Sequence, residues 1–172
     1  MFFSKRRIVL FGVISVLAIT IILLPEIQNY VNAPNVDAID FKLANITINN
    51  ISNDTNNVEL LLSFIVFNQS DKTATTSKVE YDLFGNDEFL GHGILSYEDI
   101  PLNGRPQFLP QQTTTLNSPI VLEPTDSNLQ LIEAILKQSS ILIDDTIDWE
   151  VNGTSQLASA LVIIEKKFNS SL

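Results

Sequence analysis

The chain has 172 residues, with 20 Asp and Glu against 10 Lys and Arg, and its net charge is −10. A chain this acidic lacks the basic stripe that binds a phosphate backbone, so we expect no nucleic-acid partner. It has no cysteine, which excludes disulfides, thiolate metal sites and cysteine nucleophiles.

An uncharged apolar run, residues 8–24, follows the basic cluster Lys5, Arg6 and Arg7. A helix that crosses a bilayer needs about 20 apolar residues, within a range of about 17–25. We therefore expect an uncleaved transmembrane helix that contacts the lipid bilayer through residues 8–24, with residues 1–25 forming a cytoplasmic stub and anchor. Two alternatives are a signal peptide cleaved after Ala33 and a helix buried in a core.

The basic cluster also predicts the orientation of the chain. Basic residues stay on the cytoplasmic side, so Lys5, Arg6 and Arg7 place the N-terminus inside and the rest outside. We expect a single-pass plasma-membrane protein with an extracytoplasmic C-terminal domain. In an exported chain, Asn-x-Ser/Thr triplets are candidate glycosylation sites, although a chain rich in Asn, Ser and Thr also contains some by chance. The candidates are Asn45, Asn50, Asn53, Asn68, Asn152 and Asn169.

The exported part reads mainly as β-strands. Residues 26–40 have no regular period and are expected to form a tether. Alternating or continuous apolar segments then predict strands. These are 41–49 with Ala44, Ile46 and Ile48 on one side, 58–68 as a central strand, 78–84 and 89–95 as an antiparallel pair, 112–122, 146–152 and 156–168. The side chains expected to point inward are Val79, Tyr81, Leu83, Ile147, Trp149 and Val151.

One segment of the exported part has the period of a helix. Leu129, Ile132, Ile135 and Leu136 form an apolar stripe, and Thr125 or Asp126 can cap its start. Short strands joined by turns, with a single helix, favour an antiparallel β-sandwich over a parallel sheet. The expected fold is therefore mainly β, with one short helix, preceded by the transmembrane helix.

The only histidine, His92, lies between Gly91 and Gly93. Glycines spaced in this way share one face of a strand and allow a neighbouring layer to approach closely. His92 then points to the opposite face. A catalytic histidine needs a nucleophile or an orienting carboxylate, and a metal site needs further ligands. We expect no catalytic role, no metal and no cofactor at His92.

Carboxylates crowd together near residue 145, at Asp144, Asp145, Asp148 and Glu150. Hard cations bind such oxygens, so a weak calcium site is one interpretation. The regular loop spacing of a calcium site is absent, and Asp148 and Glu150 alternate with apolar residues as on the wet face of a strand. Paired carboxylates also occur in glycoside hydrolases. No aromatic residues suited to a substrate cleft accompany them, so we expect no enzymatic activity.

An alternating aromatic strand, a glycine turn and a Leu-Gly-x-Gly sequence resemble the core of the late embryogenesis abundant (LEA) type 2 family, also called the water stress and hypersensitive response domain. The matching residues are Tyr81, Leu83, Phe84, Gly85, Leu90, Gly91 and Gly93. The family usually has Pro after the asparagine that ends the preceding strand, whereas Gln69 follows Asn68 here.

The resemblance covers residues 41–168, leaving 169–172 as a tail. It implies an immunoglobulin-like or fibronectin-like sandwich, a role in desiccation or stress responses, and no catalytic residues. The expected function is non-enzymatic protection by a membrane-anchored extracytoplasmic domain. The alternative is a cell-surface adhesion or envelope-assembly module whose protein partner is unknown.

Overall fold

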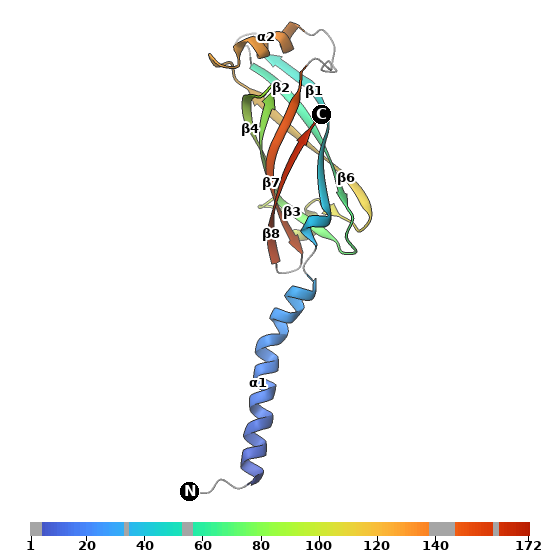
Figure 1. Ribbon diagram of the computed structural model, residues 1–172, viewed down its shortest axis with the longest axis vertical. Helices are drawn as coiled ribbons and strands as arrows, with labels where there is room; N and C mark the ends of the chain where they lie inside the picture. The colour runs from blue at the N-terminus through green and yellow to red at the C-terminus, as the bar shows by residue number, and fades with distance from the viewer. Residues whose placement is uncertain (1–4, 33–34, 53–56, 138–146, 160–161) are drawn as a thin grey trace. The chain divides into compact units, whose positions relative to one another are not determined.

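A computed structural model describes residues 5–32, 35–52, 57–137, 147–159 and 162–172 (Figure 1). The chain divides into two compact units, one containing the N-terminal helix and one containing the strands.

The N-terminal unit contains helix α1, Lys5–Asn32. Its large apolar side chains between Val9 and Ile27 are exposed by 47–70%. No helix among the described residues meets the requirements of length and hydropathy for a membrane span, so the predicted transmembrane helix is not found. The helix also continues past Pro25 into the predicted tether. Proline fixes φ near the helical value, so the chain can remain helical around it at the cost of a hydrogen bond.

The first sheet has three antiparallel strands in the order β1-β2-β6. They are β1 (Ile39–Ser52), β2 (Asn57–Asn68) and β6 (Gln112–Leu122). The prediction that 58–68 is a central strand is confirmed. The predicted placement of Ala44 on the same side as Ile46 is wrong, because the pairing of β1 with β2 shifts between Leu43 and Asn45. This irregularity leaves Ala44 exposed while Leu43 and Ile46 are both buried.

The second sheet has the order β4-β3-β7-β8, with the short strand β5 also paired to β3. The strands are β3 (Ala74–Gly85), β4 (Glu88–Ser96), β5 (Gln107–Phe108), β7 (Trp149–Ser159) and β8 (Val162–Ser171). Asn86 and Asp87 join β3 to β4 with φ angles of 50° and 65°. Two positive φ values are typical of a tight hairpin turn, which Asn and Asp tolerate better than most residues.

The last two strands differ most from the prediction. Strand β7 extends to Ser159, and β8 begins at Val162 and continues to Ser171 through most of the predicted tail. The predicted division between 152 and 156 is wrong because Gly153 lies inside β7, paired with Tyr81. At the other end, β1 begins at Ile39, inside the predicted tether.

Helix α2, Leu129–Lys137, confirms the predicted helix. Thr125 is at its start, where its Oγ1 accepts a hydrogen bond from the Asn128 backbone N–H at 3.3 Å. Leu131 and Ile132 are buried, whereas Leu129 is 43% exposed, so the predicted position of Leu129 on the apolar stripe is wrong.

The two sheets share one apolar core, and contacts close both sides between them. On one side, β4 lies against β6. On the other side, the Leu43 backbone N–H donates to Ser170 Oγ at 2.9 Å. There Phe41 also stacks on Phe168, with ring centroids 4.8 Å apart. Tyr81, Leu83, Val79, Trp149, Val151 and Ile147 are all buried, as predicted.

Candidate functional site

The glycine–histidine–glycine segment lies where β3, β4 and β6 meet. Tyr81 on β3 donates from its hydroxyl to Ser118 Oγ on β6 at 2.7 Å, so this side chain crosses the core between the sheets. A Cβ on Gly93 would overlap the Tyr81 ring, and a Cβ on Gly91 would be 3.4 Å from Ile120 Cδ1. Gly93 therefore makes room for Tyr81, and Gly91 allows the β6 layer to approach.

A third glycine of the LEA-like sequence has a related role. A Cβ on Gly85 would be 2.8 Å from Leu131 Cδ2 on α2 and 3.1 Å from Leu90 Cδ1. Gly85 thus leaves space for side chains that cover one end of the core. Tyr81, Gly85, Gly91 and Gly93 are therefore packing residues, as the sequence predicted for the two glycines beside His92.

His92 points away from this core. Its Nδ1 is 2.8 Å from Asp82 Oδ1 on the neighbouring strand, and the two side chains are 50% and 48% exposed. The pair is a solvated contact across β3 and β4. An orienting carboxylate is therefore present, which the sequence did not reveal, but a nucleophile is not among the hydrogen-bond partners found for His92.

An amide cluster lies on the same outer face, on β7 and β8. Asn169 Nδ2 donates to Asn152 Oδ1 at 2.6 Å and to Glu150 Oε1 at 2.7 Å. Asn152 Nδ2 donates to the same Glu150 oxygen at 3.1 Å. Because Asn152 pairs with Asp82 across β3 and β7, this cluster and the His92–Asp82 pair form one polar row across four strands.

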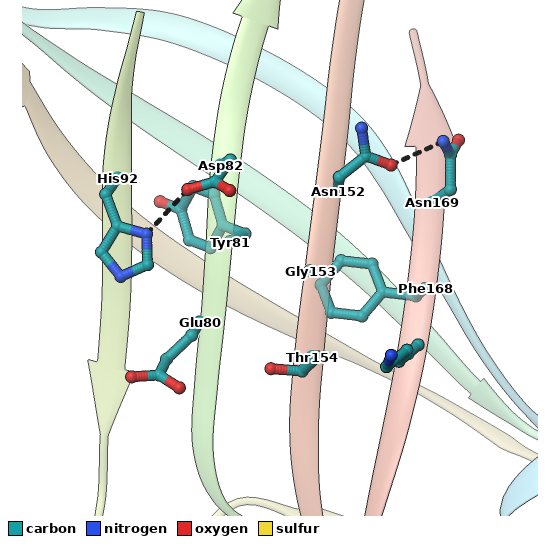
Figure 2. A pocket seen from close by; sticks show the side chains of 10 residues that line it. Glu80, Tyr81, Asp82, His92, Asn152, Gly153, Thr154, Phe168 and Asn169 are labelled. Carbon is teal, nitrogen blue, oxygen red and sulfur yellow. Dashed lines mark hydrogen bonds and ion pairs between the residues drawn. The ribbon is translucent and has the colours of Figure 1, made fainter. Parts of the chain in front are cut away.

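The polar row borders an open depression of about 650 Å³. Figure 2 shows the His92–Asp82 pair on one side, the Asn152–Asn169 pair on the other, and the Phe168 ring reaching from β8 toward Gly153. A Cβ on Gly153 would be 2.5 Å from Phe168 Cζ. The lining residues are Glu80, Tyr81, Asp82, His92, Asn152, Gly153, Thr154, Lys167, Phe168 and Asn169.

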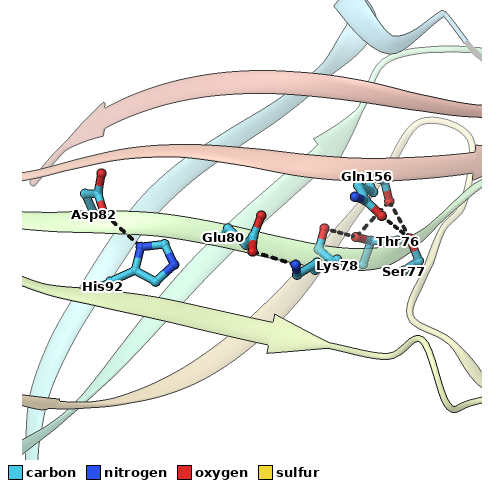
Figure 3. A network of polar contacts seen from close by, with 7 residues as sticks. All are labelled: Thr76, Ser77, Lys78, Glu80, Asp82, His92 and Gln156. Carbon is cyan, nitrogen blue, oxygen red and sulfur yellow. Dashed lines mark hydrogen bonds and ion pairs between the residues drawn. The ribbon is translucent and has the colours of Figure 1, made fainter.

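The carboxylates of the depression already have partners (Figure 3). Glu80 forms an ion pair with Lys78, and Asp82 contacts His92. The Glu80 hydrogen bond, ahead of smaller electrostatic contributions, raises the pKa of the Lys78 ammonium group. Among the described residues, no three His, Asp or Glu side chains come together as a metal site.

The structure places the other candidate residues differently. Asp144 and Asp145 of the calcium interpretation lie outside the described residues. Asp148 is exposed, and Glu150 accepts the amide hydrogen bonds given above.

One candidate glycosylation site is inaccessible. Asn68 is completely buried, and its Nδ2 donates to the backbone oxygens of Lys72 and Phe108, both at 2.8 Å. The prediction of Asn68 as a glycan acceptor is therefore wrong, because the nitrogen that would carry the sugar is enclosed. Asn53 lies outside the described residues. The exposed candidates are Asn45, Asn50, Asn152 and Asn169.

We predict that Tyr81→Phe changes how stability depends on pH. Burial raises the pKa of Tyr81, and the Ser118 hydrogen bond offsets part of this rise. The unfolded chain therefore loses its tyrosine proton first, near pH 10, and folding stability falls as pH rises further. Removing the hydroxyl should lower the free energy of unfolding by about 1 kcal/mol near pH 8. Near pH 11 this difference should be smaller, because the variant has no hydroxyl at residue 81 to ionise and does not lose stability in that way.

Urea unfolding followed by fluorescence of Trp149, the only tryptophan, measures both values. Tyr97→Phe is the matched control, because burial also raises the pKa of Tyr97 but this side chain is only half-buried. A Tyr81→Phe cost that stays constant from about pH 8 to about pH 11 would contradict the burial of the hydroxyl.

No protein-family model matches the chain, and none of the curated proteins matches it. Solved structures do match. A protein from Archaeoglobus fulgidus is 13% identical, with 78% of this chain and 91% of that chain covered and a TM-score of 0.42. A protein from Arabidopsis thaliana is 14% identical; the match covers 77% of this chain and 80% of that protein, with a TM-score of 0.48. A proposed LEA protein is 12% identical; the match covers 98% of this chain and 90% of that protein, with a TM-score of 0.41. Similarity at this level does not establish a shared function.

Proposed function

We propose that the β-strand unit is a LEA type 2-like domain that protects other molecules during loss of water and has no enzymatic activity. The observation that carries this proposal is the role of the LEA-like residues. The Tyr81 hydroxyl links the two sheets through Ser118, Gly93 leaves room for the Tyr81 ring, and Gly85 accommodates Leu131 of α2. These residues, which carry the resemblance in sequence, are packing residues in this fold.

The strand order supports an immunoglobulin-like or fibronectin-like topology. In immunoglobulin domains, strands A, B and E share one sheet, and strands C, F and G share the other, to which C′ can be added. Assigning β1, β2 and β6 to A, B and E, and β4, β3, β7 and β8 to C′, C, F and G, reproduces that order.

The proposed protective mechanism depends on the outer surface. The domain is strongly acidic, and its outward positions carry hydroxyl and amide groups such as Thr113, Thr115 and Asn117 on β6. Such groups hold water, and like charge keeps neighbouring molecules apart. A dispersed population of stable, hydrated domains would then separate labile proteins as solvent is removed.

Protection is tested by drying a labile enzyme with the full chain and measuring the activity recovered. We expect more recovery than with an inert folded protein at equal mass. A variant in which the exposed Asp40, Asp99 and Glu123 become amides should protect less, because its charge is lower. Recovery equal to that with the inert protein would contradict the protective function.

We also propose that α1 attaches the domain to the plasma membrane, with the domain outside the cytoplasm. The proposal is supported by the uncharged sequence of residues 8–24 and by the exposure of the large apolar side chains between Val9 and Ile27. A helix that is apolar all round requires an apolar environment. The basic cluster before it favours a cytoplasmic N-terminus.

Alkaline extraction of membranes from expressing cells tests attachment. We expect the full chain to stay in the membrane pellet. A variant carrying Ile14→Lys and Leu17→Lys should be released, because both positions lie near the middle of residues 8–24 and each lysine costs about 3 kcal/mol at the centre of a bilayer. Release of the unaltered chain would contradict attachment, and protease protection in sealed vesicles would report the orientation.

A further inference from the structure

We infer that the depression on the outer face of β4, β3, β7 and β8 is a binding site for a neutral polyhydroxylated ligand, such as a sugar or a cyclic polyol. This inference goes beyond the proposed protective function, because it assigns a ligand to one face of the domain. The volume of about 650 Å³ lies in the range of small-molecule sites, roughly 300–1,000 Å³.

Charge compensation selects a neutral ligand. The carboxylate of Glu80 is balanced by Lys78, and that of Asp82 contacts His92. Lys167 adds one positive charge to the lining, and Glu150, which accepts from the lining residues Asn152 and Asn169, adds one negative charge at its border. Neither positive nor negative charge is therefore in clear excess in the depression. Selecting a strongly charged ligand would require such an excess of the opposite sign.

The donors and acceptors are of mixed kind and belong to rigid strands. Asn152 and Asn169 supply amides, Thr154 supplies a hydroxyl, and Asp82 supplies a carboxylate with free lone pairs. A sugar hydroxyl both donates and accepts hydrogen bonds, so the hydroxyls of one sugar can bond to the amides, to the Thr154 hydroxyl and to the Asp82 carboxylate. The amides are held in position by Glu150, which reduces the ordering cost of binding.

The bottom of the depression supplies an apolar surface. Gly153 has no side chain, and the Phe168 ring lies beside it (Figure 2). Phe168 is held by stacking on Phe41 at 4.8 Å and by an edge contact with Phe64 at 6.1 Å. One face of the ring is covered by Phe41, and the part that lines the depression offers apolar carbon against which the C–H groups of a sugar can pack. An apolar surface bordered by amides and a carboxylate is suited to that amphipathic shape.

The test uses the purified full chain in a detergent without a sugar headgroup. Saturation-transfer NMR with glucose, trehalose and myo-inositol measures binding of neutral ligands, and glucuronate and glucose 6-phosphate are the charged comparisons. We expect the neutral compounds to bind with little dependence on salt, because no ion pair forms. Absence of binding by every neutral compound, or binding of the charged compounds alone, would overturn the assignment.

Two substitutions locate the site. Asn169→Leu should weaken binding of the best neutral compound about tenfold, and Thr154→Val, which keeps the side-chain shape, about two- to fivefold. Asn117→Leu is the matched control, because Asn117 is an exposed strand asparagine on the other sheet, where it accepts from Ser63. Equal affinity of Asn169→Leu, Thr154→Val and the unaltered chain would also overturn the assignment. If Asn169→Leu impairs folding, the affinity of Thr154→Val alone decides the test: affinity equal to that of the unaltered chain would overturn the assignment.

Discussion

Gly93→Ala is expected to destabilise the protein by about 2–3 kcal/mol, the upper range for overpacking a core. The added methyl group would overlap the Tyr81 ring. That ring cannot move aside freely, because its hydroxyl donates to Ser118 at 2.7 Å and its edge contacts Phe64, with centroids 5.1 Å apart. The substitution must therefore either break the link between the sheets or displace β4.

Gly91→Ala is the matched control, two residues away on the same strand and the same face. Its methyl group would be 3.4 Å from Ile120 Cδ1 and 3.5 Å from Leu122 Cδ2, both ends of flexible side chains. Since glycine within a strand is itself unfavourable by about 0.5–1 kcal/mol, Gly91→Ala should be neutral or slightly stabilising. Urea unfolding monitored by Trp149 fluorescence gives both free energies. Equal effects at the two positions would show that Tyr81 does not lie against Gly93.

Asn68→Ala is expected to cost about 3 kcal/mol, because it removes four hydrogen bonds made by a completely buried side chain. The Asn68 amide nitrogen donates to the backbone oxygens of Lys72 and Phe108. Its carbonyl oxygen accepts from the backbone N–H of Ser70 at 3.0 Å and from Ser70 Oγ at 2.6 Å. One buried side chain thus joins the end of β2, the following turn and β5.

Asn68→Asp separates this network from a simple loss of volume. It keeps the acceptor for Ser70 but places a carboxylate beside two carbonyl oxygens. Burial should raise the pKa of the new carboxyl group, so its neutral form is favoured in the folded state. Stability should therefore fall as pH rises through that pKa and be recovered in acid. Asn117→Asp, exposed on β6, is the control and should show little of this dependence. An Asn68→Asp variant as stable as the control at pH 7 would contradict the burial of Asn68.

Local patterns predicted the strands well where the interior contacts one face. The alternation of Val79, Tyr81 and Leu83, and of Ile147, Trp149 and Val151, corresponds to burial in the structure. The pattern failed at Ala44, because an irregularity in strand pairing changes which side chains point inward. Such an irregularity depends on the partner strand, which the local sequence does not contain.

The division between the last two strands failed for a related reason. The strand was expected to end at residue 152, whereas Gly153 is an interior residue of β7 that leaves room for Phe168. Its role depends on a side chain 15 residues further along the chain, as the numbering shows. Glycine in a strand has two interpretations, a turn or a close approach, and only the neighbouring strand decides between them.

The candidate site could not be predicted for the same physical reason. Asp82, His92, Asn152 and Asn169 come from four strands, and their contacts depend on pairing between distant segments. The direction of His92 was predictable, because Gly91 and Gly93 had to face inward. The local sequence could not show that Asn68 is buried, because an Asn-x-Ser/Thr triplet does not reveal whether its asparagine lies in the core.

The closed interior between the two sheets is tested most directly by nuclear Overhauser contacts of the Tyr81 ring in the full chain. Strong contacts are expected from this ring to the Gly93 α-protons and to the Phe64 ring, together with a slowly exchanging hydroxyl proton bound to Ser118. A Tyr81 ring that instead contacts water and nearby carboxylates, with no contact to Gly93 or Phe64, would show an open pocket where a packed core is described.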